Sequence, residues 1–303
     1  MAAGRGYLAM HSILSVVIAT RNRRDSLRRC LESLTHCHVP AGWMVEILVV
    51  DNGGTDSIVE LVASMTSAER NIEFRHFSEP RQGKSFAVNC GVAAARGKIL
   101  AFTDDDAMAD KEWLTGVINE FSRDSALDLL AGCVQDVRTD RPSRAITRHL
   151  ERVMLSGLSS LEGHVLGCNL AIRRVVLEKV RGRDIRLGPG RGLSCEDIDF
   201  THRVLRAGFR GVFSPTPVVY HDPGERDRTR EYLRGWGAFY IKFILSGDRQ
   251  VARQAWWKLH RIWTDALGEV GFLSGDPIYQ TWNIAVGACI MAIRMITTPL
   301  TGR

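Results

Sequence analysis

Four apolar runs alternate with segments of helical periodicity over the first hundred residues, and this alternation constrains the fold more than any other feature. The runs cover residues 15–19, 46–50, 72–77 and 98–102. Apolar residues at helical spacing predict helices over residues 25–34 and 85–95, and Asp56 is expected to cap another that runs to Val62. Strands that alternate with helices in this way predict an α/β fold, with a mostly parallel sheet covered by helices on both faces.

Acidic residues follow two of these runs. Asp51 follows the second, and Asp104, Asp105 and Asp106 follow the fourth. Ligands of parallel sheets bind outside the carboxyl ends of the strands, so these carboxylates can converge on one crevice. Hard cations such as Mg2+ and Mn2+ take oxygen ligands and share them with substrate phosphates. The cluster therefore predicts a metal and diphosphate site; the alternative is a solvated acidic turn that caps the helix beginning near Lys111.

Composition limits the class of protein. A chain of 303 residues with 45% hydrophobic residues fits one large domain, or a domain with an extension, and can bury a substantial core. The formal net charge of +6 suits a phosphate-bearing partner or an anionic membrane surface, and we expect no nucleic-acid partner. Seven scattered cysteines without a C-x-x-C pair argue against a disulfide framework or a zinc site, and favour a reducing, cytoplasmic compartment.

The second half of the chain is less regular. Residues 127–134 and 165–172 predict strands, and the glycine-rich residues 188–192 predict either a mobile loop or a plain surface turn. Beyond residue 223, residues 225–263 are rich in Arg, Trp and Tyr at helical spacing. Residues 278–293 are nearly uncharged but shorter than the roughly 20 apolar residues that a transmembrane helix needs, which favours an interfacial or packed helix.

Three further positions carry chemistry, each with a plainer alternative. Asp51 could accept hydrogen bonds from a nucleobase or ribose, although Asp-Asn-Gly-Gly is also good turn chemistry. Glu196 and Asp197 are expected at the start of a helix that ends at Gly208. Acidic residues are usual in the first turn of a helix, but a carboxylate that faces a cleft can act as a general base. His221 is either a metal ligand or a structural histidine.

Taken together, the motifs resemble a family 2 glycosyltransferase of the GT-A fold. The resemblance covers residues 12–222, and the motifs that carry it are, in order, Asp51-Asn52, Gly83-Lys84-Ser85 with Asn89 and Gly91, Arg96-Gly97, Asp104–Asp106, Gly167-Cys168-Asn169, and Glu196-Asp197-Ile198-Asp199. It implies a Rossmann-like GT-A catalytic domain over residues 1–222. Residues 223–303 would then form a helical C-terminal extension.

The resemblance also implies roles for individual residues. The nucleotide-sugar pocket would be formed by Thr20, Arg21, Asn22, Arg23, Asp51, Lys84, Asp104 and Asp105. Mg2+ or Mn2+ would be held by Asp106 and Asp104, with His221 as a third ligand. Asp197 matches the catalytic base of the family, and Glu196 its neighbour on the acceptor side. The Q-x-x-R-W signature of processive members is missing, which favours transfer of a single sugar.

The implied function is inverting transfer of one sugar from a nucleotide-diphosphate sugar, most commonly a UDP-sugar, to a hydroxyl of a glycan or lipid-linked glycan, as in polysaccharide biosynthesis. We expect a peripheral contact of residues 225–300 with the inner face of the cell membrane, although a packed regulatory or dimerising extension fits these residues as well. Two other functions remain open: a non-catalytic carbohydrate- or lipid-binding protein of the same fold, and a sugar-1-phosphate nucleotidylyltransferase. A nucleotidylyltransferase would carry a glycine-rich phosphate loop after the first strand. This sequence has Ala19-Thr20-Arg21-Asn22 at that position instead.

Overall fold

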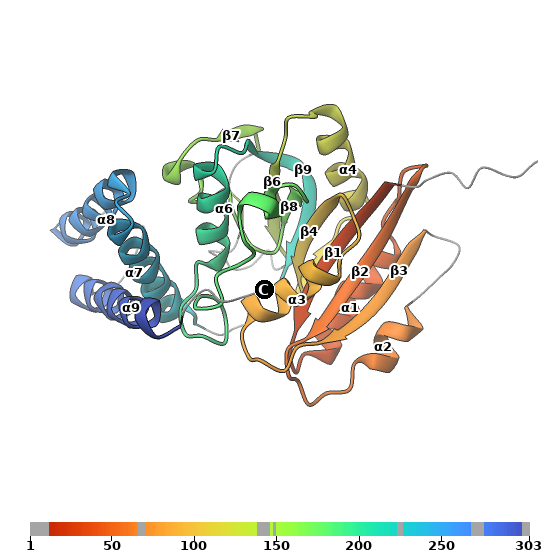
Figure 1. Ribbon diagram of the computed structural model, residues 1–303, viewed down its shortest axis with the longest axis horizontal. Coiled ribbons are helices and arrows are strands. Elements are labelled where there is room, and N and C mark those ends of the chain that lie inside the picture. Colours follow the sequence, from red (N-terminus) through yellow and green to blue (C-terminus); the bar gives the residue numbers. More distant parts are fainter. Residues whose placement is uncertain are drawn as a thin grey trace, which may run out of the picture.

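A central sheet with helices on both faces forms the body of the protein, and a group of helices lies to one side of it (Figure 1). The structure is a computed structural model that describes residues 12–65, 71–137, 146–147, 150–222, 227–267 and 276–298. The predicted domain boundary at residues 222 and 223 stays a prediction, since residues 223–226 lie outside the described ranges.

Nine strands form the sheet in the described part of the chain: β1 (Ser12–Thr20), β2 (Trp43–Asp51), β3 (Ile72–Ser78), β4 (Ile99–Asp104), β5 (Ala107–Ala109), β6 (Leu129–Asp136), β7 (Val153–Leu155), β8 (Leu170–Arg173) and β9 (Gly211–His221). Their order is β3-β2-β1-β4-β8-β6-β9-β5, and β7 pairs with β9. Strands β1 to β4 are parallel, as predicted. The sheet is mixed as a whole, because β8 runs antiparallel between β4 and β6.

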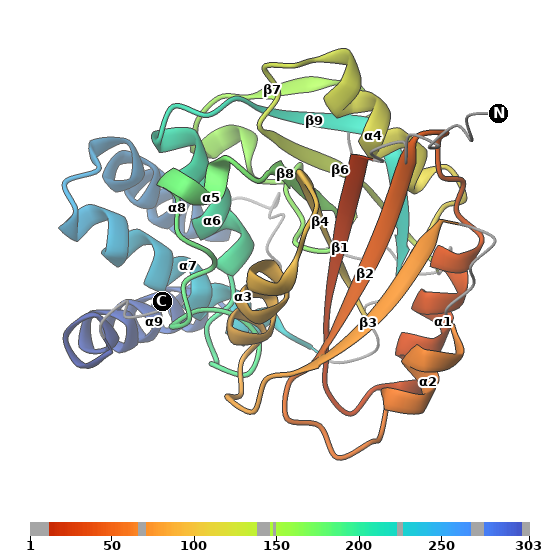
Figure 2. The same ribbon diagram turned by 45° about the vertical axis from the view of Figure 1, so that its right-hand side comes forward.

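The helices are α1 (Arg24–Thr35), α2 (Val59–Ser64), α3 (Lys84–Ala94), α4 (Trp113–Arg123), α5 (Val176–Lys179), α6 (Glu196–Arg206), α7 (Thr229–Leu245), α8 (Arg249–Leu267) and α9 (Pro277–Thr297), with a short 3-10 turn over Leu158–Ser160. Side chains of β1 alternate between two cores, as the pleat of a strand requires. Val16 and Ile18 pack with α1, α2 and α4, whereas Val17 packs on the other face with α3, α6 and α7 (Figure 2).

Two local predictions were wrong. The strand predicted over residues 165–172 begins only at Leu170, because the backbone turns before it: the Asn169 amide donates to the Leu166 carbonyl. Asp56 does not cap α2, which begins at Val59. Its carboxylate instead accepts hydrogen bonds from the backbone amides of Asn22 and Arg24, at the start of α1.

The predicted C-terminal extension is helical, and its helices pack closely. A Cβ atom at Gly237 of α7 would collide with the carbonyl of Ile284 on α9, and one at Gly287 of α9 would collide with that of Arg234 on α7. The two glycines therefore let the helix backbones touch. None of the described helices is both long and apolar enough to cross a membrane.

Candidate active site

The acidic cluster lies where β4 ends, beside the end of β9. Strand pairing places His221 opposite Ala107, which follows Asp106 directly. Ligand atoms of Asp104, Asp106 and His221 all lie within 4.8 Å of one another, and His221 Nε2 is 3.2 Å from Asp106 Oδ1. The structure thus brings together the three residues that the sequence suggested as metal ligands, from the end of β4, the turn after it and the end of β9.

The middle aspartate is not part of this group of possible ligands and has other partners. Asp105 is buried; its Oδ2 accepts a hydrogen bond of 2.8 Å from the Thr20 hydroxyl, and its Oδ1 lies 3.0 Å from Arg23 Nη1. Burial and the neighbouring Asp106 raise the pKa of Asp105 to about 6, against the opposing effects of Arg23 and Thr20. Asp105 thus joins Thr20 and Arg23, and all three were predicted to line the nucleotide pocket.

Asp106 remains ionised in this setting. Burial alone would raise the pKa of its carboxyl, but His221 and Arg23 outweigh burial and hold that pKa below its ordinary value. The distance from Arg23 Nη1 to Asp106 Oδ2 is 2.6 Å. Two carboxylates and an imidazole form a donor set that suits Mn2+ or Mg2+, so the residues present fit the metal that the sequence implied.

Lys84 connects the acidic cluster to the start of α6. Its Nζ lies 2.5 Å from Asp104 Oδ1 and 3.9 Å from Glu196 Oε1. Burial opposes the charged form, yet Asp104 and Glu196 raise the pKa of Lys84 above its ordinary value, so the ammonium stays charged. The Asn52 side chain fixes the start of α3, because its Oδ1 accepts from the Gly83 amide at 2.8 Å and its Nδ2 donates to the Arg81 carbonyl at 2.7 Å.

Other predicted pocket residues meet at the loop after β2. Asp51 Oδ1 accepts from the Gly54 amide at 2.8 Å, and Asn22 Oδ1 accepts from the Thr55 amide at 2.6 Å. Asn22 adopts a positive φ of 53° in the turn between β1 and α1. Arg21 is exposed beside it. The ends of β1 and β2 therefore form one continuous polar edge.

The two acidic residues at the start of α6 differ in exposure. Glu196 is buried, and burial together with its neighbour Asp197 raises its pKa. Asp197 is partly exposed and lies against Gly167, where a Cβ atom would stand 3.1 Å from its Oδ2. A glycine at position 167 thus leaves room beside the candidate base.

Arg183 lies in the candidate active site, although the sequence analysis did not predict it there. Its side chain is 3% exposed, with Nη1 3.6 Å from Glu196 Oε1 and its guanidinium over the Phe102 ring of β4. Its position on an irregular segment gave no periodic or motif signal. Lys84 and Arg183 place two cations beside the buried Glu196, close to the acidic cluster.

Comparison with known sequences identifies the family of this chain. The family described as glycosyl transferase family 2 matches residues 15–181. The glycosyltransferase AglE of Haloferax volcanii is 27% identical over 277 residues, which cover 89% of this chain and 84% of that protein. The dodecaprenyl-phosphate galacturonate synthase of Rhizobium johnstonii is 26% identical over 171 residues; these cover 55% of this chain and 49% of the synthase, so the match spans about half of that protein.

Solved structures show the same fold. The mannosyltransferase PcManGT from Pyrobaculum calidifontis, in complex with GDP-Man and Mn2+, superposes with a TM-score of 0.62 at 18% identity, covering 93% of this chain and 86% of that one. S. aureus TarS 1-349 in complex with UDP-GlcNAc gives a TM-score of 0.58 at 14% identity, covering 96% and 76%. The matched family spans more than half of the sequence, and the chain therefore belongs to glycosyl transferase family 2, a family of sugar-transferring enzymes.

Proposed function

We propose that the protein transfers a single sugar, with inversion, from a nucleotide-diphosphate sugar to a hydroxyl of a glycan or lipid-linked glycan. The observation that carries this proposal is the position of Lys84 between Asp104 and Glu196. Lys84 thereby links the aspartates suited to a metal and a diphosphate to the start of α6, which holds the candidate base. The similar proteins support the substrate class, since solved neighbours contain GDP-Man or UDP-GlcNAc.

On the donor side, the polar edge of Asn22 and Asp51 would receive the nucleoside, and Lys84 would contact the diphosphate. Asp104, Asp106 and His221 would hold Mn2+ or Mg2+. When bound, the cation would supply positive charge to the leaving diphosphate. Lys84 is largely shielded from solvent and charged, so it adds a preorganised cation of its own beside the same group.

On the acceptor side, Asp197 would act as the general base. The acceptor oxygen forms a bond to the anomeric carbon as the bond from that carbon to the diphosphate oxygen breaks. The hydroxyl proton moves to Asp197, and the negative charge leaves on the nucleoside diphosphate. Attack from the face opposite the leaving group inverts the anomeric centre. Asp197 is partly exposed, as a residue that meets an incoming acceptor must be.

Calorimetric titration with UDP, GDP and dTDP, each with and without Mn2+, tests the proposal. Tight, Mn2+-dependent binding of one nucleotide supports it and identifies the donor class. No binding of any of the three would favour the non-catalytic alternative. Turnover that requires pyrophosphate would instead point to a nucleotidylyltransferase.

We also propose that the C-terminal extension contacts the inner, anionic face of the cell membrane. Three tryptophans of α8 are exposed by 47–57%: Trp256, Trp257 and Trp263. Arg249, Arg253 and Arg261 are exposed on the same helix. Interfacial tryptophans combined with exposed arginines suit an anionic lipid surface. The similarity to a dodecaprenyl-phosphate galacturonate synthase agrees with a lipid-linked acceptor at such a surface.

A further inference from the structure

The segment between α5 and α6, residues 181–195, carries the glycine-rich turn and leads directly to Glu196 and Asp197. We call it the connecting segment. It contains no helix or strand, only one bridge between Gly188 and Leu193. Its position therefore depends on what holds it from outside, and much of what holds it comes from the C-terminal extension.

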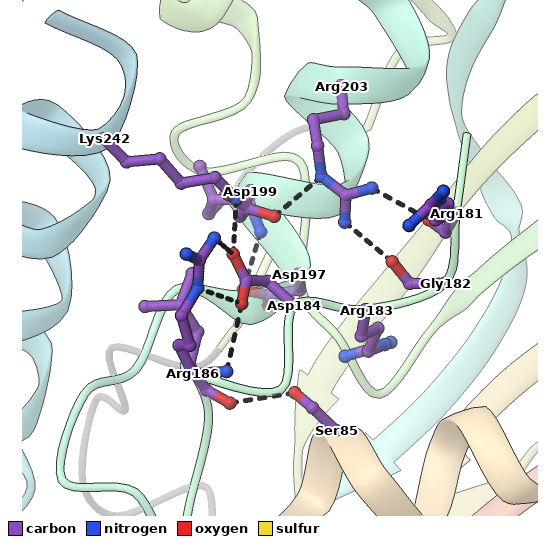
Figure 3. A network of polar contacts seen from close by, with 12 residues as sticks. Ser85, Arg181, Gly182, Arg183, Asp184, Arg186, Asp197, Asp199, Arg203 and Lys242 are labelled. Atoms are coloured by element: carbon purple, nitrogen blue, oxygen red, sulfur yellow. Dashed lines mark hydrogen bonds and ion pairs between the residues drawn. The ribbon is translucent and has the colours of Figure 1, made fainter. Parts of the chain in front are cut away.

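The first anchor is Lys242 on α7 (Figure 3). Its ammonium lies 2.7 Å from Asp184 Oδ2 in the connecting segment and also pairs with Asp199 Oδ1, in the first turn of α6. All three side chains are buried. Arg186 also binds Asp184 through two hydrogen bonds, of 2.9 and 2.7 Å. Burial would raise the pKa of Asp184, but Arg186 and Lys242 outweigh it and hold that pKa below its ordinary value.

Arg203 of α6 extends this network to the start of the connecting segment. Its Nε donates to Asp199 Oδ2 at 2.9 Å, and its terminal nitrogens donate to the carbonyls of Arg181 and Gly182 at 2.8 and 2.9 Å (Figure 3). Asp199 thus lies between two cations, one from α7 and one from its own helix. Because Asp199 is two residues from Asp197, Lys242 acts on the turn that presents the candidate base.

The second anchor is Arg294 on α9. Its guanidinium donates to the carbonyl of Arg186, just before the glycine-rich turn, at 2.7 Å, and to that of Arg191, within the turn, at 2.9 Å. The other face of the turn lies on the start of α3: the Lys84 amide donates to the Pro189 carbonyl at 3.1 Å, and the Ser85 hydroxyl donates to the Leu187 carbonyl at 2.9 Å. The turn is thus held between α9 and the residue proposed to bind the diphosphate.

The backbone of α7 completes the contact. A Cβ atom at Gly235 would lie 2.6 Å from the Ser194 carbonyl oxygen, and the Ser194 amide donates to the Glu231 carbonyl at 3.3 Å. Since Ser194 is two residues before Glu196, α7 supports the connecting segment at the point where it enters α6.

We propose that Lys242 and Arg294 are positioning residues of the active site: the C-terminal helices hold the connecting segment, and through it the glycine-rich turn and the start of α6. The effect on turnover rests on the function proposed above, whereas the mechanical role does not. Arg294 holds the turn beside Lys84, so its loss acts on donor binding. Lys242 holds the first turn of α6, so its loss acts on the chemical step as well.

Limited trypsin digestion tests the mechanical role without any substrate. Mass spectrometry would follow cleavage after Arg191, inside the turn. Arg294→Met is expected to accelerate this cleavage about 10-fold or more, because local opening rather than global unfolding exposes the bond. Arg206→Met is the matched control: it removes a 3.0 Å ion pair to Asp248 at the opposite end of α6 and should leave the cleavage rate unchanged. Equal rates in Arg294→Met and wild type would overturn the proposal.

Steady-state kinetics test whether this positioning affects turnover. Arg294→Met should raise the KM for the donor about 10-fold with a smaller change in kcat, and Lys242→Met should lower kcat by about 10- to 100-fold, since misplacement of about 1 Å has effects of this size. Lys242→Arg, which keeps the charge, should recover more activity than Lys242→Met. If Lys242→Met fails to fold, the kinetics of Arg294→Met and Lys242→Arg still test whether the anchors affect turnover. Faster cleavage with a wild-type KM in Arg294→Met would show that the anchor does not affect donor binding, and would overturn its positioning role in the active site.

The two proposals can fail separately. A wild-type protein that binds no nucleotide, combined with the expected cleavage pattern, would refute the proposed function and leave the anchors intact. An active wild-type enzyme with neither faster cleavage nor raised KM in Arg294→Met would refute the anchors alone.

Discussion

Lys84 Nζ lies 2.5 Å from Asp104 Oδ1, so the first residue of α3 forms an ion pair with the last residue of β4. The pair includes one of the carboxylates suited to a metal, and Lys84 should have opposite effects on the binding of metal and of diphosphate. A cation beside Asp104 disfavours a second cation, but it attracts a diphosphate. Nucleotide and metal binding should therefore respond differently to its removal.

Lys84→Met is expected to weaken binding of the nucleoside diphosphate in Mn2+ by about 10-fold or more, which corresponds to about 1.4 kcal/mol. Binding of Mn2+ alone should be no weaker than in wild type, because a competing positive charge has been removed. Calorimetry with Mn2+ alone and with nucleotide plus Mn2+ measures both. Lys98→Met, at the exposed opposite end of β4, is the control. Weakened Mn2+ binding in Lys84→Met would contradict this view of the ion pair.

Asp106→Ala, unlike Lys84→Met, should lose the binding of Mn2+ itself. The change removes the carboxylate that faces both His221 and Arg23. Nucleotide affinity should then be the same with and without Mn2+, as the same calorimetric titrations would show. Asp110→Asn, a carboxylate on the same segment that is outside the cluster, should keep the Mn2+ dependence. A retained Mn2+ dependence in Asp106→Ala would mean that other residues hold the metal.

Asp197→Asn should abolish transfer while donor binding remains within about twofold of wild type. The amide cannot accept the acceptor proton, and removal of a general base costs about 10²–10⁴-fold. The amide has nearly the same size, so it fits the space beside Gly167. Transfer rates and nucleotide titrations on the same preparation separate the two effects. Near-normal turnover in this variant would show that another group takes the proton.

The sequence predicted the strands and acidic residues of the candidate site, but not the distant residues that hold the segments around it. Strands β1 to β4 and the cluster of Asp104 and Asp106 follow from local patterns: apolar runs that end in polar residues. The proposed roles of Lys242 and Arg294 could not be predicted, because their partners lie 43 to 108 residues away in the chain. Asp105 shows a related limit, since adjacent aspartates look alike in sequence and only the fold turns one of them inward.

The extension should bind anionic membranes through its exposed tryptophans. Flotation with vesicles of phosphatidylcholine, with and without phosphatidylglycerol, measures this binding. The protein should float with the anionic vesicles, and high salt should weaken the association because charge attraction contributes. Trp256→Ser with Trp257→Ser should reduce the bound fraction several-fold. Leu150→Ser, which alters a side chain that is 80% exposed in the catalytic part of the chain, should not. Self-association without vesicle binding would instead indicate a dimerising surface.

Glu46 should make folding stability depend on pH. Its buried carboxylate accepts hydrogen bonds of 2.6 Å from Ser15, 2.6 Å from Arg75 and 2.8 Å from Arg96 Nε. Burial raises its pKa, but these contacts outweigh burial, so the pKa falls below the ordinary 4.5. The unfolded chain therefore takes up the proton first as the pH falls. The stabilisation is complete above about pH 4.5 and is lost as the pH decreases through the lower, folded-state pKa.

Glu46→Gln should accordingly lower the free energy of unfolding by about 1.5–3 kcal/mol at pH 7, the usual range for hydrogen bonds to a charged group. The difference from wild type should shrink below about pH 4.5, where protonation removes the charge from the wild-type side chain too. Urea unfolding at pH 7 and at pH 3.5 measures both differences. Glu73→Gln is the matched control, since Glu73 pairs with the same Arg96 at the surface and should cost no more than about 1 kcal/mol. A difference between Glu46→Gln and wild type that stays constant down to pH 3.5 would show that the charge of Glu46 does not stabilise the fold.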